Sequence, residues 1–374
     1  MNPFMQKFNE NLIMSGRPEK MLDADFKSAL TYLAGEQVSL SPTLLFAFSD
    51  MTRSELHEFA AVWQTLAYEK RRRVAQAMTE LAEERIEADF TRIFRYLLDD
   101  EDAPVRVQAI NGLWEDEDPA LVRLFIGALR SDPDAHVRAA AAEGLGRFLL
   151  LSETKRIPAA DGDEIQAALL AAIRNTTEDR LVHRRAMEAI AFVGDETVRD
   201  IITLAYADDD AKMRASAIFA MGRSADPYWK RTVAQELYST DPQMRFEAAR
   251  AVGELEFKAA VPRLIDLLDD ADREVQTAAI TSLGQIGGKD ARRALVAVIE
   301  GDDEVARELA QDALDELEFA SGSDMLLVDI GLESEEDALL AEELSNDQDD
   351  LDEGDEDEPR DLLDDGALRP RRKR

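Results

Sequence analysis

Residue types that commonly carry out catalysis are scarce in this 374-residue sequence. Cysteine is absent, which excludes disulfides, thiolate nucleophiles and cysteine-ligated zinc or iron–sulfur centres. Only three histidines occur, His57, His136 and His183, and carboxylates are abundant without an isolated pair that stands out as acid and base. The run Ile286-Gly287-Gly288-Lys289 lacks the spacing of a phosphate-binding loop and is predicted to be a turn. We therefore expect no catalytic residue, no metal site and no cofactor.

The elements that position the side chains are set by an internal repeat. Its clearest copy reads Val137-Arg138, then Ala141 and Leu145-Gly146. Apolar residues at positions 0, +4 and +8 form one stripe of a helix, and two helices of about 12 residues with two short turns fill one unit. The residue at position 0 is here named the anchor, and successive anchors are 32, 45, 31, 31, 31 and 31 residues apart. The seven anchors are Val105, Val137, Val182, Met213, Met244, Val275 and Ala306.

Three features complete the predicted unit. Glycine at +9, as in Gly146, is expected to end the anchor helix in a left-handed conformation. The long spacing holds an insertion of about 14 residues, roughly 152–165, which we predict to be a loop because it contains Lys155-Arg156-Ile157-Pro158 and Asp161-Gly162-Asp163. Helix N-caps are predicted at the aspartates that precede four anchors, namely Asp134, Asp210, Asp241 and Asp272.

This unit resembles the HEAT repeat, specifically the short version called the PBS-lyase HEAT-like repeat. The resemblance covers about 100–318 and implies an all-α fold, an α-solenoid or superhelix of stacked helix pairs. We accordingly predict three regions. Residues 1–99 form a helical N-terminal region and cap, with an amphipathic helix over 54–68; residues 100–320 form the HEAT-like solenoid; residues 321–374 form an acidic, largely disordered tail that ends in the basic run 369–374.

The charge distribution narrows the choice of partner. The formal net charge is −35, of which the tail from residue 322 carries −14 and the preceding residues −21. Such a field repels nucleic acid and anionic membranes and steers basic proteins. No stretch approaches the roughly 18 apolar residues of a membrane span. We expect a cytoplasmic monomer that binds a protein partner, possibly a basic one; nucleic-acid association through the basic end remains an alternative.

HEAT-like enzymes provide the remaining alternative. Those that hydroxylate a modified lysine carry several His-Glu pairs, whereas this sequence has only His57-Glu58. HEAT-like DNA glycosylases have a basic, aromatic-rich concave face, which the acidic body does not match. Bilin lyases and assembly factors of phycobiliproteins resemble the chain at the level of the repeat alone. We therefore favour a non-catalytic scaffold or adaptor and keep the bilin lyase as its alternative.

Candidate binding residues follow from the register of the repeat. In HEAT arrays the anchor helix usually lines the concave side, and positions +2, +6 and +10 point away from the buried stripe. Aromatic and arginine residues gather there, and such residues often anchor interfaces. The alternative is that the phenylalanines pack between repeats as core. The candidate partner-binding residues are Phe192, Phe219, Phe246, Arg184, Arg223 and Arg250.

A second row of mostly basic residues occupies position +1. It could be read as a binding ladder, but the resemblance implies a structural role, in which each side chain pairs with acidic turn residues of a neighbouring unit. Gln276 interrupts the row. Its other members are Arg106, Arg138, His183, Arg214, Arg245 and Arg307.

Overall fold

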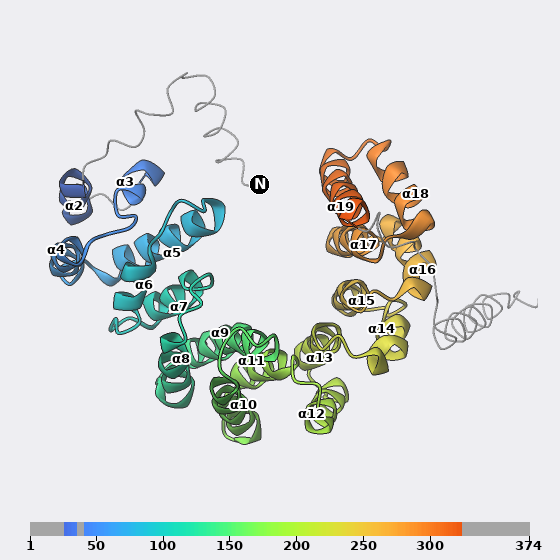
Figure 1. The fold of residues 1–374 in the computed structure, drawn as a ribbon, viewed down its shortest axis with the longest axis horizontal. Coiled ribbons are helices and arrows are strands. Elements are labelled where there is room, and N and C mark those ends of the chain that lie inside the picture. Colours follow the sequence, from blue (N-terminus) through green and yellow to red (C-terminus); the bar gives the residue numbers. More distant parts are fainter. Residues whose placement is uncertain (1–25, 36–40, 324–374) are drawn as a thin grey trace, which may run out of the picture. The chain divides into compact units, whose positions relative to one another are not determined.

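The computed structural model describes residues 26–35 and 41–323, with the side chains of 319–323 excepted, and the predicted tail lies outside them. Every regular element in these residues is a helix, so the predicted all-α class is confirmed (Figure 1). The elements up to Asp226 are α2 (Phe26–Ala34), α3 (Pro42–Phe46), α4 (Arg53–Trp63), α5 (Tyr68–Glu84), α6 (Thr91–Leu97), α7 (Ala103–Gly112), α8 (Ala120–Ser131), α9 (Ala135–Glu153), α10 (Ala159–Arg174), α11 (Arg180–Ile190), α12 (Glu196–Tyr206) and α13 (Ala211–Arg223). The elements after it are η2 (Pro227–Trp229), α14 (Lys230–Glu236), α15 (Pro242–Glu254), η3 (Lys258–Ala260), α16 (Val261–Asp266), η4 (Leu267–Asp269), α17 (Arg273–Ile286), α18 (Gly288–Ile299) and α19 (Glu304–Ser323).

Two compact units divide the chain between Asp226 and Pro227. In the first unit the anchor helices α7, α9, α11 and α13 pack on one another in order, and α8, α10 and α12 each pack beside the anchor helix next to them. In the second unit α15, α17 and α19 form the corresponding anchor row, with α14, α16 and α18 as companions. The predicted helix pair is therefore the building block of both units. The predicted boundary at residue 99, between the N-terminal region and the solenoid, stays a prediction. Helix α7, which follows this residue, packs on both α5 and α6, which precede it.

The anchor stripe forms the core, as its apolar pattern predicts. In α9 the side chains of Val137, Ala141 and Leu145 are buried, and Val275, Ala279 and Leu283 repeat the arrangement in α17. A single helix pair leaves this stripe exposed, so each anchor helix depends on its neighbour for burial. The stability of each unit therefore resides in contacts between successive pairs.

The predicted aspartate caps are all present. The Asp134 carboxylate accepts a hydrogen bond from the backbone N–H of His136 at 2.8 Å, and Asp272 accepts one from Glu274 at 2.8 Å. Asp210 and Asp241 cap α13 and α15 in the same way. Each such bond satisfies one of the backbone donors that a helix leaves free at its start.

The prediction for the +9 glycines is wrong. Gly146, Gly253 and Gly284 lie inside helices, and among the described glycines only Gly287 and Gly288 have positive φ. A Cβ on Gly146 would lie 3.0 Å from the Cα of Ala189, and a Cβ on Gly284 would lie 2.8 Å from the Cβ of Ala313. These glycines are therefore required because the next anchor helix approaches too closely for a side chain, not because the helix must end.

The predicted insertion loop is also mostly helical. The helix α9 extends to Glu153 and α10 begins at Ala159, so only residues 154–158 connect them. Asp161, Gly162 and Asp163 lie inside α10, where a Cβ on Gly162 would come within 2.8 Å of the Ser152 Cβ. Glycine in this sequence context indicates close packing of two lengthened helices, which turn propensity alone did not distinguish from a loop.

The helices before α6 join the repeats through a hydrogen bond from Trp63 and an ion pair of Arg72. Phe59 and Trp63 of α4 are buried and stacked with ring centroids 5.4 Å apart, and α4 ends at Trp63 rather than at the predicted residue 68. The Trp63 Nε1 donates a hydrogen bond to Asp100 at 2.6 Å. The Arg72 guanidinium makes two hydrogen bonds of 2.7 Å to the Asp102 carboxylate. These contacts attach the N-terminal helices to the turn before the first anchor.

The close approach of anchor helices can be tested with one substitution. Gly284→Ala should lower the free energy of unfolding by about 1–3 kcal/mol through overpacking against Ala313, although alanine favours a helix over glycine by about 1 kcal/mol. Gly127→Ala in α8 is the matched control, because no atom lies within 4 Å of the added Cβ. Urea unfolding followed by circular dichroism measures both. Equal stabilisation of the two variants would contradict the packing role.

Candidate protein-binding surface

The +1 side chains share one contact with their own repeat. In six repeats the side chain donates a hydrogen bond to the backbone carbonyl six residues earlier, in the turn that precedes its helix. The donor–acceptor pairs are Arg106–Asp100 at 2.8 Å, Arg138–Asp132 at 2.8 Å, Arg214–Asp208 at 2.9 Å, Arg245–Ser239 at 2.8 Å, Gln276–Asp270 at 2.7 Å and Arg307–Gly301 at 2.8 Å. The glutamine therefore makes the same turn contact without a charge, which shows that the contact itself needs only a donor.

Three of these arginines also bind the turn of the following repeat. Arg106 makes two hydrogen bonds of 2.8 Å to the Asp132 carboxylate, and Arg245 makes two of 2.8 Å to Asp270. Arg138 binds Glu178 in the corresponding position, with the shortest bond at 2.7 Å. The Arg245 guanidinium holds the pKa of Asp270 below its ordinary value of 3.8. These contacts support the proposed structural role of the row, because the guanidinium donors already join two turns.

His183 occupies the +1 position of its repeat but reaches a different carbonyl. Its Nε2 lies 2.8 Å from the carbonyl oxygen of Asn175. Within the described residues, no group of three or more histidine or carboxylate side chains is arranged to hold a metal ion. The imidazole therefore contributes to the turn before α11.

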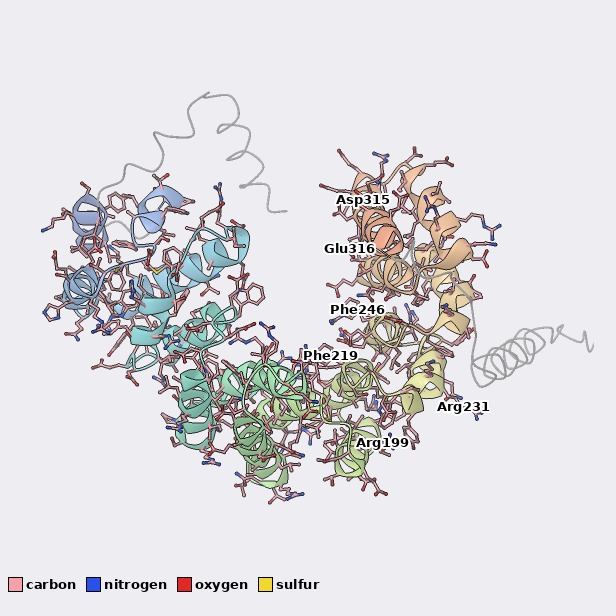
Figure 2. The ribbon with its side chains drawn as sticks, in the orientation of Figure 1. Arg199, Phe219, Arg231, Phe246, Asp315 and Glu316 are labelled. Carbon is pink, nitrogen blue, oxygen red and sulfur yellow. The ribbon has the colours of Figure 1, made fainter. Side chains whose placement is uncertain are left out.

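In the first unit two of the candidate phenylalanines share one arginine. The Arg223 guanidinium carbon lies 5.1 Å from the ring centroid of Phe192 and 4.5 Å from that of Phe219. All three residues are half-buried. Phe219 points away from the companion helix α12, whose Arg199 lies on the opposite side of the helix pair (Figure 2). Arg184 is held separately, since its Nε donates to the Ser216 hydroxyl at 2.8 Å.

In the second unit Phe246 and Arg250 form a comparable pair. The Arg250 guanidinium carbon lies 5.7 Å from the ring centroid of Phe246, and its nitrogens lie 3.6 Å from Glu247 and 3.8 Å from Glu254. Phe246 points away from α14, which carries Arg231 (Figure 2). Phe246 also lines a pocket of about 330 Å³, together with the apolar residues Ile280, Val305, Ala306 and Leu309.

The six candidate residues thus form two groups, each described within its own unit. Phe192, Phe219 and Phe246 are half-buried, whereas Phe125, Phe148 and Phe257 are fully buried core residues. The +2 and +6 rows are not uniformly exposed: Ala139, Ala215 and Glu188 are buried, and Arg185 binds the Glu188 carboxylate at 2.6 Å. The register therefore located aromatic residues at the surface but overstated how open the rest of that face is.

The repeat register did not single out the exposed aromatic residue Trp114; Tyr68 and Tyr228 are exposed as well. Trp114 is 51% exposed and occupies position +9, where four other repeats have glycine. The departure from the repeat pattern was visible in the sequence, but the neighbouring exposed Ile86 belongs to no repeat position. Together these residues border a separate pocket in the first unit.

Comparison with known proteins supports the nature of the repeat. A family model of HEAT repeats matches residues 91–160 and 231–315, which confirms the predicted resemblance over these two stretches. No curated protein matches the chain by sequence. None of the helices that the structure describes has the length and apolar character needed to cross a membrane.

Three solved structures illustrate the likeness of the fold. The X-ray structure of YibA from Escherichia coli is 17% identical, covers 76% of this chain and 98% of that one, and has a TM-score of 0.41. The complex of CpcE and CpcF of phycocyanin lyase from Nostoc sp. PCC7120 is 16% identical, with 76% and 97% covered and a TM-score of 0.46. Yeast importin-β, Kap95p, is 13% identical, with 91% and 57% covered and a TM-score of 0.42.

Removing one +1 arginine tests its structural role. Arg245→Ala should lower the free energy of unfolding by about 1.5–3 kcal/mol, because it leaves the partly buried Asp270 carboxylate and the Ser239 carbonyl without their donor. Arg273→Ala is the control, since its pair with Asp303 is largely exposed and such pairs contribute about 0–1 kcal/mol. Denaturant unfolding of both variants measures the two free energies of unfolding. An equal loss of stability in both variants would refute the structural role of Arg245.

The same pair makes a prediction about acid. The pKa of Asp270 is depressed in the folded chain, so its contribution to stability is present above the ordinary pKa of 3.8 and is lost as pH falls through the folded value. The stability difference between wild type and Arg245→Ala should therefore be constant from pH 7 to 5 and shrink below about pH 4. Unfolding at a series of pH values measures it. A difference that grows in acid would contradict the ion pair.

Proposed function

We propose that this chain is a non-catalytic HEAT-repeat scaffold that binds a protein partner through one side of its anchor helices. This side, here named the outward side, faces away from the companion helices and carries Phe219 and Phe246 (Figure 2). The observation that carries the proposal is the stack of Phe192, Arg223 and Phe219, in which one guanidinium contacts two half-buried rings. In the first unit this stack joins the turn after α11, which holds Phe192, to α13, so it presents a connected surface rather than separate side chains. The same helices supply the buried stripe on their other side.

The physical chemistry of this surface suits a protein interface. Aromatic and arginine side chains contribute most of the binding energy at many interfaces. Aromatic rings do so because they cover a large area with few rotatable bonds. Burying the exposed part of a ring in an interface stabilises the complex by about 25 cal/mol per Å² of apolar surface. A half-buried ring keeps this contribution available, whereas a fully buried one such as Phe148 has already used it in folding.

Charge favours a basic partner. The net charge of the chain is −35, and the last described anchor helix, α19, has exposed carboxylates at Glu308, Asp312, Asp315 and Glu316. Asp315 and Glu316 lie on the surface of this helix (Figure 2). A field of this sign accelerates encounter with a basic protein, although screening at physiological salt limits its range to about 8 Å. Charge would thus guide the encounter, and the rings would fix the contact.

Substitution of the rings tests the proposal. A chain with Phe219→Ser and Phe246→Ser should retain its helicity and lose at least about tenfold in partner binding, a change of about 1.4 kcal/mol. Leu204→Ser is the matched control, because Leu204 lies 73% exposed on the companion helix α12. Affinity purification from the native host with quantitative mass spectrometry identifies proteins retained by wild type and control but not by the double variant. The proposal fails if the double variant retains the same proteins as the wild type. If the double variant unfolds, Phe219→Leu and Phe246→Leu replace it, because they remove the rings and keep an apolar side chain; binding equal to that of the wild type would then refute the proposal.

A further inference from the structure

The pocket beside Phe246 in the second unit combines buried apolar walls with an exposed apolar edge. It encloses about 330 Å³ and is lined by residues of α15, α17 and α19. Ile280 is buried and Leu309 is half-buried, whereas Val305 is 66% exposed. The volume lies at the lower end of the roughly 300–1,000 Å³ of ligand sites. The pocket therefore admits a few side chains of a ligand rather than a whole folded element.

The repeat itself indicates that this apolar edge is not needed for the fold. Val305 lies one residue before the anchor of α19, and Leu309 lies three residues after it. The same two positions of α15 hold Gln243 and Glu247, which form a hydrogen bond of 3.0 Å with each other. In no other repeat are both positions occupied by large apolar residues. A polar pair thus serves the fold equally well, and the apolar pair is particular to the last described repeat.

Carboxylates continue the same side of α19. Glu308, Asp312 and Glu316 follow one another at intervals of four residues, a rise of about 6 Å per step. Asp312 and Glu316 lie seven and eleven residues after Val305, so the helical period places them on the same side as this valine. All three carboxylates are exposed, and none of them pairs with a cation among the described residues. We name these three residues the acidic stripe.

The charged residues that line the pocket leave a negative balance. They are Arg273, Glu274 and Asp303. Arg273 and Asp303 form an ion pair with each other, which leaves the Glu274 carboxylate. Arg250 of α15, whose guanidinium lies over the Phe246 ring, is held by two glutamates of its own helix. Both arginines are thus engaged within the chain, and the charge that remains for a ligand is negative.

We propose that the pocket and the acidic stripe together bind a basic amphipathic helix of a protein partner. A partner helix has the same rise per residue as α19, so one of its faces can bring apolar side chains against Val305 and Leu309. Lysines or arginines beside that face then lie opposite the acidic stripe. Apolar contact supplies affinity, and the carboxylates select a basic partner. A second copy of this chain, with its net charge of −35, is repelled, as are nucleic acid and anionic membranes.

This inference rests on the proposed scaffold function, because Phe246 belongs to the outward side and also lines the pocket. It adds the chemistry of the partner segment and the place where it docks. The stack around Phe219 lies in the first unit and does not line this pocket. Variants at Val305 and in the acidic stripe therefore test the inference without touching the residues that carry the proposed function.

The experiment measures the binding of defined peptides to the full-length chain by fluorescence anisotropy. The probe is a fluorescein-labelled peptide of about 14 residues, roughly four helical turns, with leucines at helical spacing and lysines at the other positions. Its binding should saturate and should weaken as salt rises. A lysine–serine peptide of equal charge and a leucine–glutamate peptide with the same leucines should each bind at least about tenfold more weakly, a change of about 1.4 kcal/mol.

A first pair of variants tests the apolar edge. Val305→Ser should weaken binding of the leucine–lysine peptide at least about fivefold, because an exposed apolar side chain is lost from the contact. Val296→Ser is the matched control, since Val296 is 39% exposed on the companion helix α18 and does not line the pocket. It should bind as the wild type does. Circular dichroism verifies that both variants keep their helicity.

A second pair of variants tests the acidic stripe. The double variant Glu308→Gln and Asp312→Asn should bind the leucine–lysine peptide more weakly and with a shallower dependence on salt. Glu256→Gln with Asp269→Asn removes the same charge from two exposed positions of the second unit that do not line the pocket. This control should keep the salt dependence of the wild type.

Three results would overturn the inference. They are equal binding by Val305→Ser and Val296→Ser, equal affinity for the lysine–serine peptide, and no saturable binding of the leucine–lysine peptide up to about 1 mM. Failure of the scaffold function is recognised separately. In that case host proteins are retained without Phe219 and Phe246, although the peptide still requires Val305.

Discussion

Neighbouring anchor helices approach until the backbone of one meets a small side chain of the next, and the rest of each unit is arranged around this separation. Position +9 of one repeat faces position +7 of the following one: Gly146 meets Ala189, and Gly284 meets Ala313. Where the pair is Gly253 and Ser282, the serine hydroxyl also donates to the Ala249 carbonyl at 2.7 Å. Such an approach lets the apolar stripes interlock, and it leaves no space for a methyl group.

The turns between helices are fixed by polar contacts that complement this packing. An aspartate caps the anchor helix, and the +1 side chain donates to the turn before it, as in Asp241 and Arg245. Arginine then reaches the next repeat, as it does at Asp270, and so couples the turns of two repeats. Apolar contact sets the distance between helices, and these polar contacts set where each helix begins. These turn contacts fix where each anchor helix begins, while Phe219 and Phe246 contact Arg223 and Arg250 on another side of the same helices.

Much of this arrangement could be predicted from the sequence, because it repeats. Apolar periodicity identified the anchor helices, and the aspartates before the anchors identified their starts. The role of glycine could not be derived in this way, since the same residue type serves helix ends and close contacts, and only the position of Ala189 or Ala313 distinguishes them. The column of small residues at +7, from Gly112 to Ala313, was present in the sequence and carried that information.

The candidate surface was predictable in part. The register placed Phe192 and Phe219 on one side of the predicted anchor helices. Phe192 instead lies in the turn after α11, and its contact with Arg223 of α13 depends on side-chain geometry. Glu188 belongs to the same face but is buried. Its carboxylate forms an ion pair with Arg185 of its own helix. The pocket at Trp114 joins a repeat position to the irregular turn at Ile86, and a repeat pattern contains no information about such a turn.

Hydrogen–deuterium exchange of the chain with and without its purified partner tests the central claim most directly, since it compares the two sides of one helix pair. Binding through the outward side of the anchor helices predicts slowed exchange in α11 and α13, and little change in the companion helix α12 between them. Slowed exchange in α12 with α11 and α13 unchanged would contradict the account.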